Sequence, residues 1–296
     1  MPIIILFLAA AAMAQTDILP IFSYEYAHAK NQNISSPNAG FLLRGVYGDT
    51  NKADTLVVGA FYQRYNIGNP VFDSPNLYHD INFLAQYQTG RHKWIALFRS
   101  TAAKPIYGGM FTTLWGGLYG YEVQRNGIFT TILGGGIGEA DGWVLPFPMI
   151  QVAMNTQLVS AYFEYIGNLR LDLTLRPGKK FRMTNEISIE TYSGIHGVAF
   201  DCLFWFRPFA NGDTEDHQAE FAGIGIGIKN RVLEFALDKT DEFYEANYYA
   251  LNGVLDITFL KFSGGYIFKG KEKYKTAKSR SFGEGYYVAG QALYIF

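Results

Sequence analysis

Strict alternation of apolar and polar residues is the feature that most limits what this chain can fold into. Along Val159–Arg176 the odd positions are apolar or small, and the even positions carry nearly all of the charged and hydroxyl side chains. A period of two residues is typical of a β-strand whose two faces meet different surroundings. The run is about twice the length of an ordinary strand and its phase never slips, which favours a tilted barrel wall.

Other segments repeat the pattern. Phe181–Tyr192 and Arg231–Lys239 alternate in the same way, and Ala222–Ile228 places branched aliphatic side chains opposite glycines. Glycine weakens a strand and leaves volume unfilled. A packed sandwich core needs that volume filled, whereas a barrel lumen does not. The glycine face therefore favours a hollow all-β structure.

Composition agrees with a barrel and leaves an all-β soluble sandwich as the alternative. Mean hydropathy is +0.00 and only 17% of the residues are charged, while 17% are aromatic. A spanning helix needs about 20 consecutive apolar residues, and no such run follows residue 15. A barrel crosses a membrane at neutral mean hydropathy because only alternate residues face lipid. The net charge of −1 argues against a nucleic-acid partner, and Lys269–Arg280 is predicted to be a solvated loop.

The first fourteen residues are predicted to be a cleaved signal peptide. Pro2–Ala12 is an apolar run too short to span a membrane, and Ala12 and Ala14 match the small-residue pattern of a cleavage site. The rest, 15–296, is predicted to be a single domain. The lone Cys202 excludes an internal disulfide and any cysteine-based zinc site.

Turn-forming residues divide 15–296 into an even number of strands. Short breaks such as Thr89–Arg91, Arg125–Gly127, Lys229–Arg231 and Leu251–Gly253 alternate with longer polar segments, as in barrels with tight turns at one end and loops at the other. We predict sixteen strands, with fourteen or twelve as alternatives, and longer external loops at 67–76, 139–148, 210–216 and 269–284. The predicted strands are 18–29, 39–48, 55–66, 80–89, 92–101, 110–124, 128–138, 147–156, 159–176, 181–193, 198–208, 217–228, 231–239, 243–251, 254–268 and 286–296.

The last predicted strand, Tyr286–Phe296, ends the chain on Phe296, with Tyr294 and Val288 in the same phase. This resembles the C-terminal insertion signal of bacterial outer-membrane β-barrel proteins, in which a terminal Phe follows apolar residues at alternate positions. The resemblance spans the whole mature chain as architecture. It implies an outer-membrane location, contact with outer-membrane lipid, and recognition of Tyr294 and Phe296 by the barrel-assembly machinery.

In a barrel, the remaining aromatic and charged residues can be assigned to the outer or the inner face of the wall. Six aromatic residues are candidates for interfacial girdles: Trp94, Trp115, Tyr119, Tyr121, Phe204 and Phe206. The even positions between 159 and 192 would face the lumen, which is the space enclosed by the barrel. Their charges would either select solutes by sign or form a salt-bridge network that fills the interior. These residues are Glu164, Arg170, Asp172, Arg176, Arg182, Glu186 and Glu190.

The sequence gives little support for a catalytic or cofactor-binding site. His28 lies seven residues before Ser35, which is wider than the His–Ser spacing of outer-membrane acyl hydrolases, and His196 falls in a predicted periplasmic turn after Ser193. His79 and Asp80 are adjacent, so they would point to opposite faces. The glycines of 134–138 lack the Lys-Ser/Thr of a phosphate-binding loop. No metal-ligand spacing occurs, and no cofactor is predicted.

Three functions follow as hypotheses. The first is a porin-like channel for small polar solutes, motivated by the glycine faces and the mixed charges. The second is a non-conducting structural or binding barrel whose external loops at 139–148 and 269–284 hold a partner or ligand. The third is an outer-membrane lipid hydrolase using His28.

Overall fold

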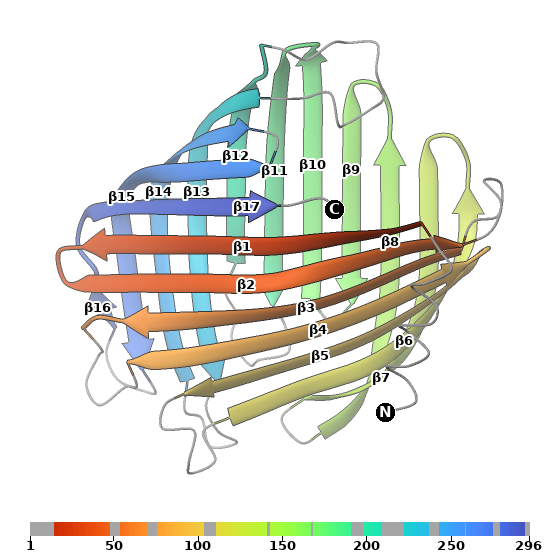
Figure 1. The fold of residues 1–296 in the computed structure, drawn as a ribbon, viewed down its shortest axis with the longest axis horizontal. Helices are drawn as coiled ribbons and strands as arrows, with labels where there is room; N and C mark the ends of the chain where they lie inside the picture. The colour runs from red at the N-terminus through yellow and green to blue at the C-terminus, as the bar shows by residue number, and fades with distance from the viewer. Residues whose placement is uncertain are drawn as a thin grey trace.

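The computed structural model describes residues 15–47, 54–69, 76–103, 111–140, 143–166, 168–190, 198–208, 222–236, 243–257, 259–274 and 279–293. They form one antiparallel sheet (Figure 1). Its strands are β1 (Gln15–Ala29), β2 (Gln32–Tyr47), β3 (Asp54–Ile67), β4 (Leu77–Thr89), β5 (His92–Ala103), β6 (Phe111–Arg125), β7 (Phe129–Ala140), β8 (Trp143–Asn155), β9 (Val159–Ile166), β10 (Asn168–Gly178), β11 (Phe181–Glu190), β12 (Val198–Phe206), β13 (Ala222–Ala236), β14 (Phe243–Ile257), β15 (Leu260–Tyr274), β16 (Arg280–Ser281) and β17 (Gly285–Leu293). No helix among these residues is long and apolar enough to cross a membrane.

The sheet closes on itself, which confirms the predicted barrel and excludes the sandwich. β1 pairs with β2 on one side and with β17 on the other, from Ile21 opposite Leu293 to Ala29 opposite Gly285. Of the seventeen strands, β16 covers two residues and pairs only with β15, so sixteen strands form the wall. In Figure 1, β1–β5 run across the front and β9–β12 stand steeply behind them, as expected for strands tilted to a barrel axis.

The strand count is correct, but two errors in the predicted boundaries cancel. The predicted strand 159–176 is a hairpin, in which β9 and β10 pair from Tyr165 opposite Leu169 to Val159 opposite Leu175. The predicted strands 217–228 and 231–239 are one strand, β13, so Lys229–Arg231 is not a turn. Leu251–Gly253 likewise lies within β14. Each facing pair of β9 and β10 joins residues of the same parity, so the alternation runs through the turn unbroken.

These errors also misplaced several connections. β11 ends and β12 begins at the barrel end opposite the one where β1 begins, not at the predicted periplasmic end; Ser193 and His196 lie outside the described residues. β12 ends and β13 begins at the same barrel end as the start of β1, and the predicted external loop 210–216 also lies outside the described residues. Most of 139–148 belongs to β7 and β8, and half of 269–284 belongs to β15 and β16, so neither segment is wholly the loop that was predicted.

Outward and inward side chains differ as the alternation predicts. Ile224 and Ile226 on β13 are 56% and 65% exposed on the outer face, whereas the intervening Gly225 is buried on the inner face. Phe204 and Phe206 on β12 are likewise exposed, and Trp205 between them is buried. The outer surface of the barrel is therefore largely apolar, and polar side chains concentrate inside.

The inward glycines do not leave the empty volume expected from the sequence. A Cβ atom added to Gly225 would lie 3.0 Å from the Trp205 ring, and one added to Gly120 would lie 3.0 Å from the end of Met149. Gly265 lies beneath Tyr287 in the same manner. Large side chains from neighbouring strands thus cover the glycines, and glycine is needed there because the rings and thioether lie directly on the backbone.

Candidate functional site: the barrel lumen

The predicted charges of β9–β11 share the inner face. Glu164 faces Arg170, Asp172 faces Glu186, and Arg182 faces the inward Trp205. Arg170 forms ion pairs with Asp172 at 2.9 Å and with Glu186 at 3.4 Å. The side chains of Arg170 and Glu186 remain 47% and 56% exposed, so this part of the inner face is in contact with solvent.

Two other predicted lumen charges, Arg176 and Glu190, lie near the ends of β10 and β11. Arg176 lies near the end of β10, where its backbone N–H donates to the Leu158 carbonyl at 2.7 Å. Glu190 ends β11 opposite Asn168, but its side chain is outside the described part of the structure. Tyr294 and Phe296 also lie outside the described residues. The role of these charges in selecting solutes stays a prediction.

A buried polar chain crosses the inner face from β5 to β9. The Lys93 ammonium donates to Gln151 Oε1 at 2.8 Å, and Gln151 in turn donates to Glu164, which also accepts a hydrogen bond from Tyr162. Lys93 faces Gly120, which faces Gly134. These two glycines carry no side chain between Lys93 and β8. Glu164 is therefore linked to a cation four strands away, which the sequence spacing did not reveal.

A second polar cluster lies on the opposite part of the wall and was missed by the sequence analysis. Glu25 on β1 accepts a hydrogen bond from the Tyr248 hydroxyl and pairs with Lys229 and Arg231 on β13, each at 3.7 Å. The Lys229 ammonium also lies 3.5 Å from the centre of the Tyr287 ring. Small residues face both partners on the neighbouring strands, with Ala250 opposite Lys229 and Ala289 opposite Glu25.

This cluster borders a polar cavity of about 180 Å³ inside the barrel. Its charged lining consists of Glu25, Asp201, Lys229, Arg231 and Lys261, and serine hydroxyls and carboxamides supply most of the rest. Asp201 accepts a hydrogen bond from Asn252 at 3.3 Å, and Asn252 also accepts one from the Tyr287 hydroxyl. The cavity is therefore lined by charges of both signs from strands far apart in the sequence.

The lumen is filled beyond this cavity, toward the end opposite the termini. Tyr78 on β4 and Tyr244 on β14 stack across the interior with ring centres 5.3 Å apart, and both are fully buried. Tyr65, Ile67 and Tyr274 belong to the same buried cluster. We call this cluster the aromatic plug, and its members are Ala27, Ala29, Ile34, Tyr65, Ile67, Tyr78, Leu233, Tyr244, Ala246, Tyr248, Ala250, Ile267, Tyr274, Phe282 and Tyr287.

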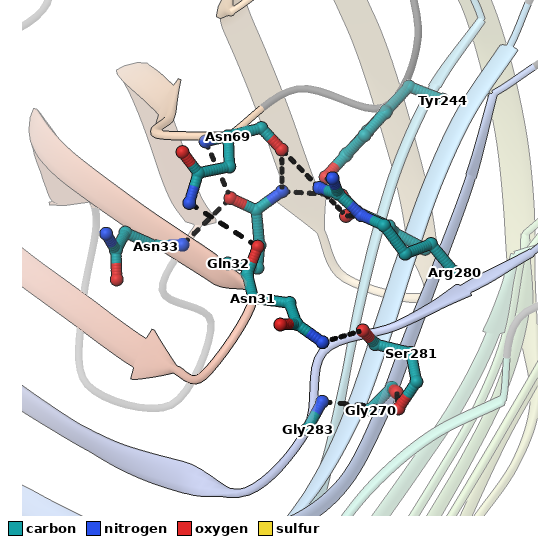
Figure 2. A network of polar contacts seen from close by, with 10 residues as sticks. Asn31, Gln32, Asn33, Asn69, Tyr244, Gly270, Arg280, Ser281 and Gly283 are labelled. Carbon is teal, nitrogen blue, oxygen red and sulfur yellow. Dashed lines mark hydrogen bonds and ion pairs between the residues drawn. The ribbon is translucent and has the colours of Figure 1, made fainter.

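A polar network completes the plug (Figure 2). The buried Glu272 carboxylate on β15 accepts hydrogen bonds from Gln32 at 2.6 Å and from Tyr244 at 2.9 Å, and it pairs with Arg280 on β16. Arg280 and Gln32 also both donate to the backbone carbonyl of Asn69, just beyond β3. Five segments of the chain are therefore joined at one carboxylate and one carbonyl.

Outer-face residues singled out in the sequence have local partners. His28 bonds Asn33 at 2.5 Å, while Ser35 accepts a hydrogen bond from Asn66 at 3.0 Å, so the structure does not join His28 to Ser35. His79 bonds Tyr62 on the outer face, and Asp80 pairs with Arg99 inside, at 3.0 Å. All six girdle candidates are exposed, as expected for side chains on the outer face of the barrel. They are Trp94, Trp115, Tyr119, Tyr121, Phe204 and Phe206.

One sequence signal could have located the second cluster. Lys229 and Arg231 continue the odd-numbered inward phase of Gly223, Gly225 and Gly227 without interruption. The sequence nevertheless predicts a turn here, because two basic residues around Asn230 have the composition of one. Their partner Glu25 is about two hundred residues away in the sequence, and its pairing depends on barrel closure.

Comparisons with known proteins add the following. No protein-family model and no curated protein matches the chain. Its fold is similar to solved structures of Acinetobacter baumannii OccAB3 (9% identity, TM-score 0.39, covering 96% of this chain and 100% of that chain) and Pseudomonas aeruginosa OpdQ (10%, 0.39, 95% and 99%). A third similar structure is an outer membrane channel from Pseudomonas putida F1 (10%, 0.34, 96% and 96%). Likenesses of this strength carry no argument about function.

Proposed function

We propose that the chain is a bacterial outer-membrane β-barrel that passes small polar solutes. The observation that carries the proposal is the contrast between the two faces of the closed wall. Isoleucines such as Ile226 are exposed outside, while Arg170 and Glu186 are exposed to solvent inside. An apolar outer surface with a charged interior is what a barrel needs in order to sit in lipid and hold water.

Strand length and aromatic placement support the membrane part of the proposal. A barrel strand needs about 9–11 residues to cross a bilayer. The wall strands have between 9 and 16 residues, except for β9 with 8. On the outer face, Trp94 packs against His92 and Tyr119, with ring centres 5.8 and 5.6 Å apart, beside the β4–β5 turn. Rings with polar groups suit the membrane–water interface, so we assign this group to a girdle.

The solute pathway is assigned to the part of the lumen along β9–β12. There the inner charges are exposed, whereas the aromatic plug fills the part bounded by β1–β4 and β13–β15. Arg170 pairs with both Asp172 and Glu186, and Arg176 and Arg182 add positive charge on the same strands, so the pathway would have only a weak charge preference. Small hydrophilic solutes of either sign are the expected substrates.

The test is single-channel conductance of the chain from Gln15 onward, refolded in detergent and added to a planar bilayer. Discrete, reproducible steps support a channel. A silent bilayer, obtained with material that shows a folded, heat-modifiable band on a gel, overturns the proposal. The control is the same protein boiled before addition, which should give no steps.

The aromatic plug favours a second candidate, a non-conducting barrel with a structural or binding role. It joins opposite parts of the wall with buried rings and thereby reduces the free bore. This candidate predicts no conductance for the wild-type chain. Conductance that appears only when the plug is cut, as in Tyr244→Ala, would identify a barrel closed by its own side chains.

Assembly is proposed to use the ends of the chain. Residues 1–14 would act as a signal peptide cleaved after Ala14, and Tyr294 and Phe296 would be read by the barrel-assembly machinery. Phe296→Ala is expected to reduce the amount of heat-modifiable protein in outer-membrane fractions without changing refolding in detergent. Equal amounts of wild-type and variant barrel in the membrane would contradict this role.

A further inference from the structure

A β-bulge in β15 turns two lysines to the outer face of the barrel. The pairing of β14 with β15 shifts between Ile267 and Lys269, so Phe268 is an extra residue. Before the shift the odd-numbered side chains face the lumen, as the buried Ile267 does, and after it the even-numbered ones do, as the buried Glu272 does. An extra residue changes which face the following side chains occupy. Lys269 and Lys271 therefore point outward, and both are exposed.

These lysines begin where the apolar part of the outer face ends. Nearer the start of β15, the outward Phe262, Tyr266 and Phe268 are exposed. Tyr249 on β14 packs against Phe268 with ring centres 6.3 Å apart, and the Lys269 ammonium lies 5.9 Å from the centre of the Tyr249 ring. Aromatic rings followed by lysines are typical of the membrane–water interface. In a membrane-embedded barrel, Lys269 thus lies at the level of the lipid headgroups.

The carboxylates on this part of the outer face leave Lys269 and Lys271 without a counter-charge. Lys273 is opposite Glu245 on β14, so those two charges balance each other. Glu284, which precedes β17, accepts a hydrogen bond from an outward tyrosine hydroxyl at 2.6 Å. Among the residues that the structure describes, none forms an ion pair with Lys269 or Lys271. An anionic group at the membrane surface would supply the missing charge.

We propose that Lys269 and Lys271 together bind the phosphate of a lipid headgroup, in the leaflet at the barrel end opposite the start of β1. Residues two apart on one face of a strand are about 7 Å apart, and two ammonium groups at that spacing can donate to one phosphate through hydrogen bonds of about 2.8 Å. A dissolved phosphate would gain little from exposed lysines, whereas the apolar wall beside them also holds the tails of a lipid. The inference rests on the membrane location in the proposed function, but not on conduction.

The test is native mass spectrometry of the refolded mature barrel in detergent, with phosphatidic acid as the probe. Diacylglycerol with the same acyl chains lacks the phosphate, and inorganic phosphate lacks the chains. We expect saturable binding of phosphatidic acid, at least about tenfold tighter than either control. Equal binding of diacylglycerol overturns the phosphate contact, and equal binding of inorganic phosphate overturns the assignment to a lipid.

Variants locate the site. Lys269→Gln combined with Lys271→Gln should weaken binding of phosphatidic acid about tenfold or more, because each lysine near anionic lipid contributes roughly fivefold. The matched control is Lys179→Gln combined with Lys180→Gln in the exposed β10–β11 turn, at the other barrel end, which removes the same charge. Unchanged affinity in the first double variant, or an equal loss in the control, overturns the assignment.

A single Lys271→Gln variant, with an expected loss of about fivefold, keeps the assignment testable if the double variant does not give a heat-modifiable band. The outcome is separate from that of the conductance experiment. A conducting barrel with no preference for phosphatidic acid overturns this inference alone. A silent barrel that binds phosphatidic acid through Lys269 and Lys271 overturns conduction alone.

Discussion

Tyr78 and Tyr244 stack with ring centres 5.3 Å apart although their strands, β4 and β14, are not neighbours in the wall. Tyr244 also donates to the buried Glu272 carboxylate. The contact therefore joins two parts of the barrel that backbone hydrogen bonds do not join directly.

Truncation of the plug should open the lumen and weaken the barrel. Tyr244→Ala removes a fully buried ring, which costs about 3–5 kcal/mol in a packed interior. We expect a lower midpoint of unfolding in denaturant and larger single-channel steps than in the wild type. Tyr24→Ala on the outer face, where Tyr24 is 49% exposed, is the matched control. Equal conductance in both variants would show that the plug does not limit the bore.

Inward and outward glycines should differ in their tolerance of a side chain. A Cβ at Gly225 would lie 3.0 Å from the Trp205 ring, whereas one at Gly117 would meet no atom within 4 Å. Gly225→Val should cost about 1–3 kcal/mol through overpacking, and Gly117→Val should be neutral or slightly stabilising. Unfolding midpoints of the two refolded variants provide the comparison. A larger loss in Gly117→Val would contradict the assignment of inner and outer faces.

The contributions of Arg280 and Glu272 to stability should be strongly coupled, because the two form an ion pair in the network of Figure 2. Arg280→Met leaves the Glu272 carboxylate buried without its cation, and we expect a loss of about 3 kcal/mol, the low end for a buried pair because Arg280 is partly exposed. Adding Glu272→Gln should restore much of that stability. The comparison is Arg170→Met, whose partly exposed pairs with Asp172 and Glu186 should each contribute less than about 1 kcal/mol. Additive effects in the Arg280–Glu272 cycle would contradict the coupling.

Charge reversal on the exposed inner face should change ion preference. Arg170→Glu adds a carboxylate beside Glu164, Asp172 and Glu186. A conducting barrel should therefore shift toward cations, since charges at a constriction select by sign. The measurement is the reversal potential in a salt gradient. Lys180→Glu, in the β10–β11 turn, should have a much smaller effect. If both variants match the wild type, the conducting pathway does not run along β9–β11.

The alternation in the sequence was sufficient to predict the barrel and the inward residues of β9–β11, but not the strand boundaries there. The β9–β10 hairpin keeps facing residues at the same parity, so the pattern of a hairpin and that of one long strand are identical. Lys229 and Arg231 produced the opposite error, because inward charges within a strand have the composition of a turn. The unbroken pairing of β13 with β14 through Lys229 and Arg231 distinguishes the two cases.

The packing of the lumen could not be predicted for a related reason. The glycines of β6, β7 and β13 indicate small inner positions, but whether a ring covers them depends on the neighbouring strand. Trp205 covers Gly225 because β12 and β13 place them opposite each other. The same holds for Glu272, whose partners Gln32, Tyr244 and Arg280 come from three other strands.

Closure of the wall by β1 and β17 has a consequence for how this protein can be made. Every hydrogen bond of that seam joins residues near opposite ends of the polypeptide, so an incomplete chain presents two unpaired strand edges, which are prone to aggregate. In a cell that exports this chain, the β1 edge therefore has to be kept from pairing with other chains until β17 has been exported. Export that stops before β17 would leave an open sheet prone to aggregation.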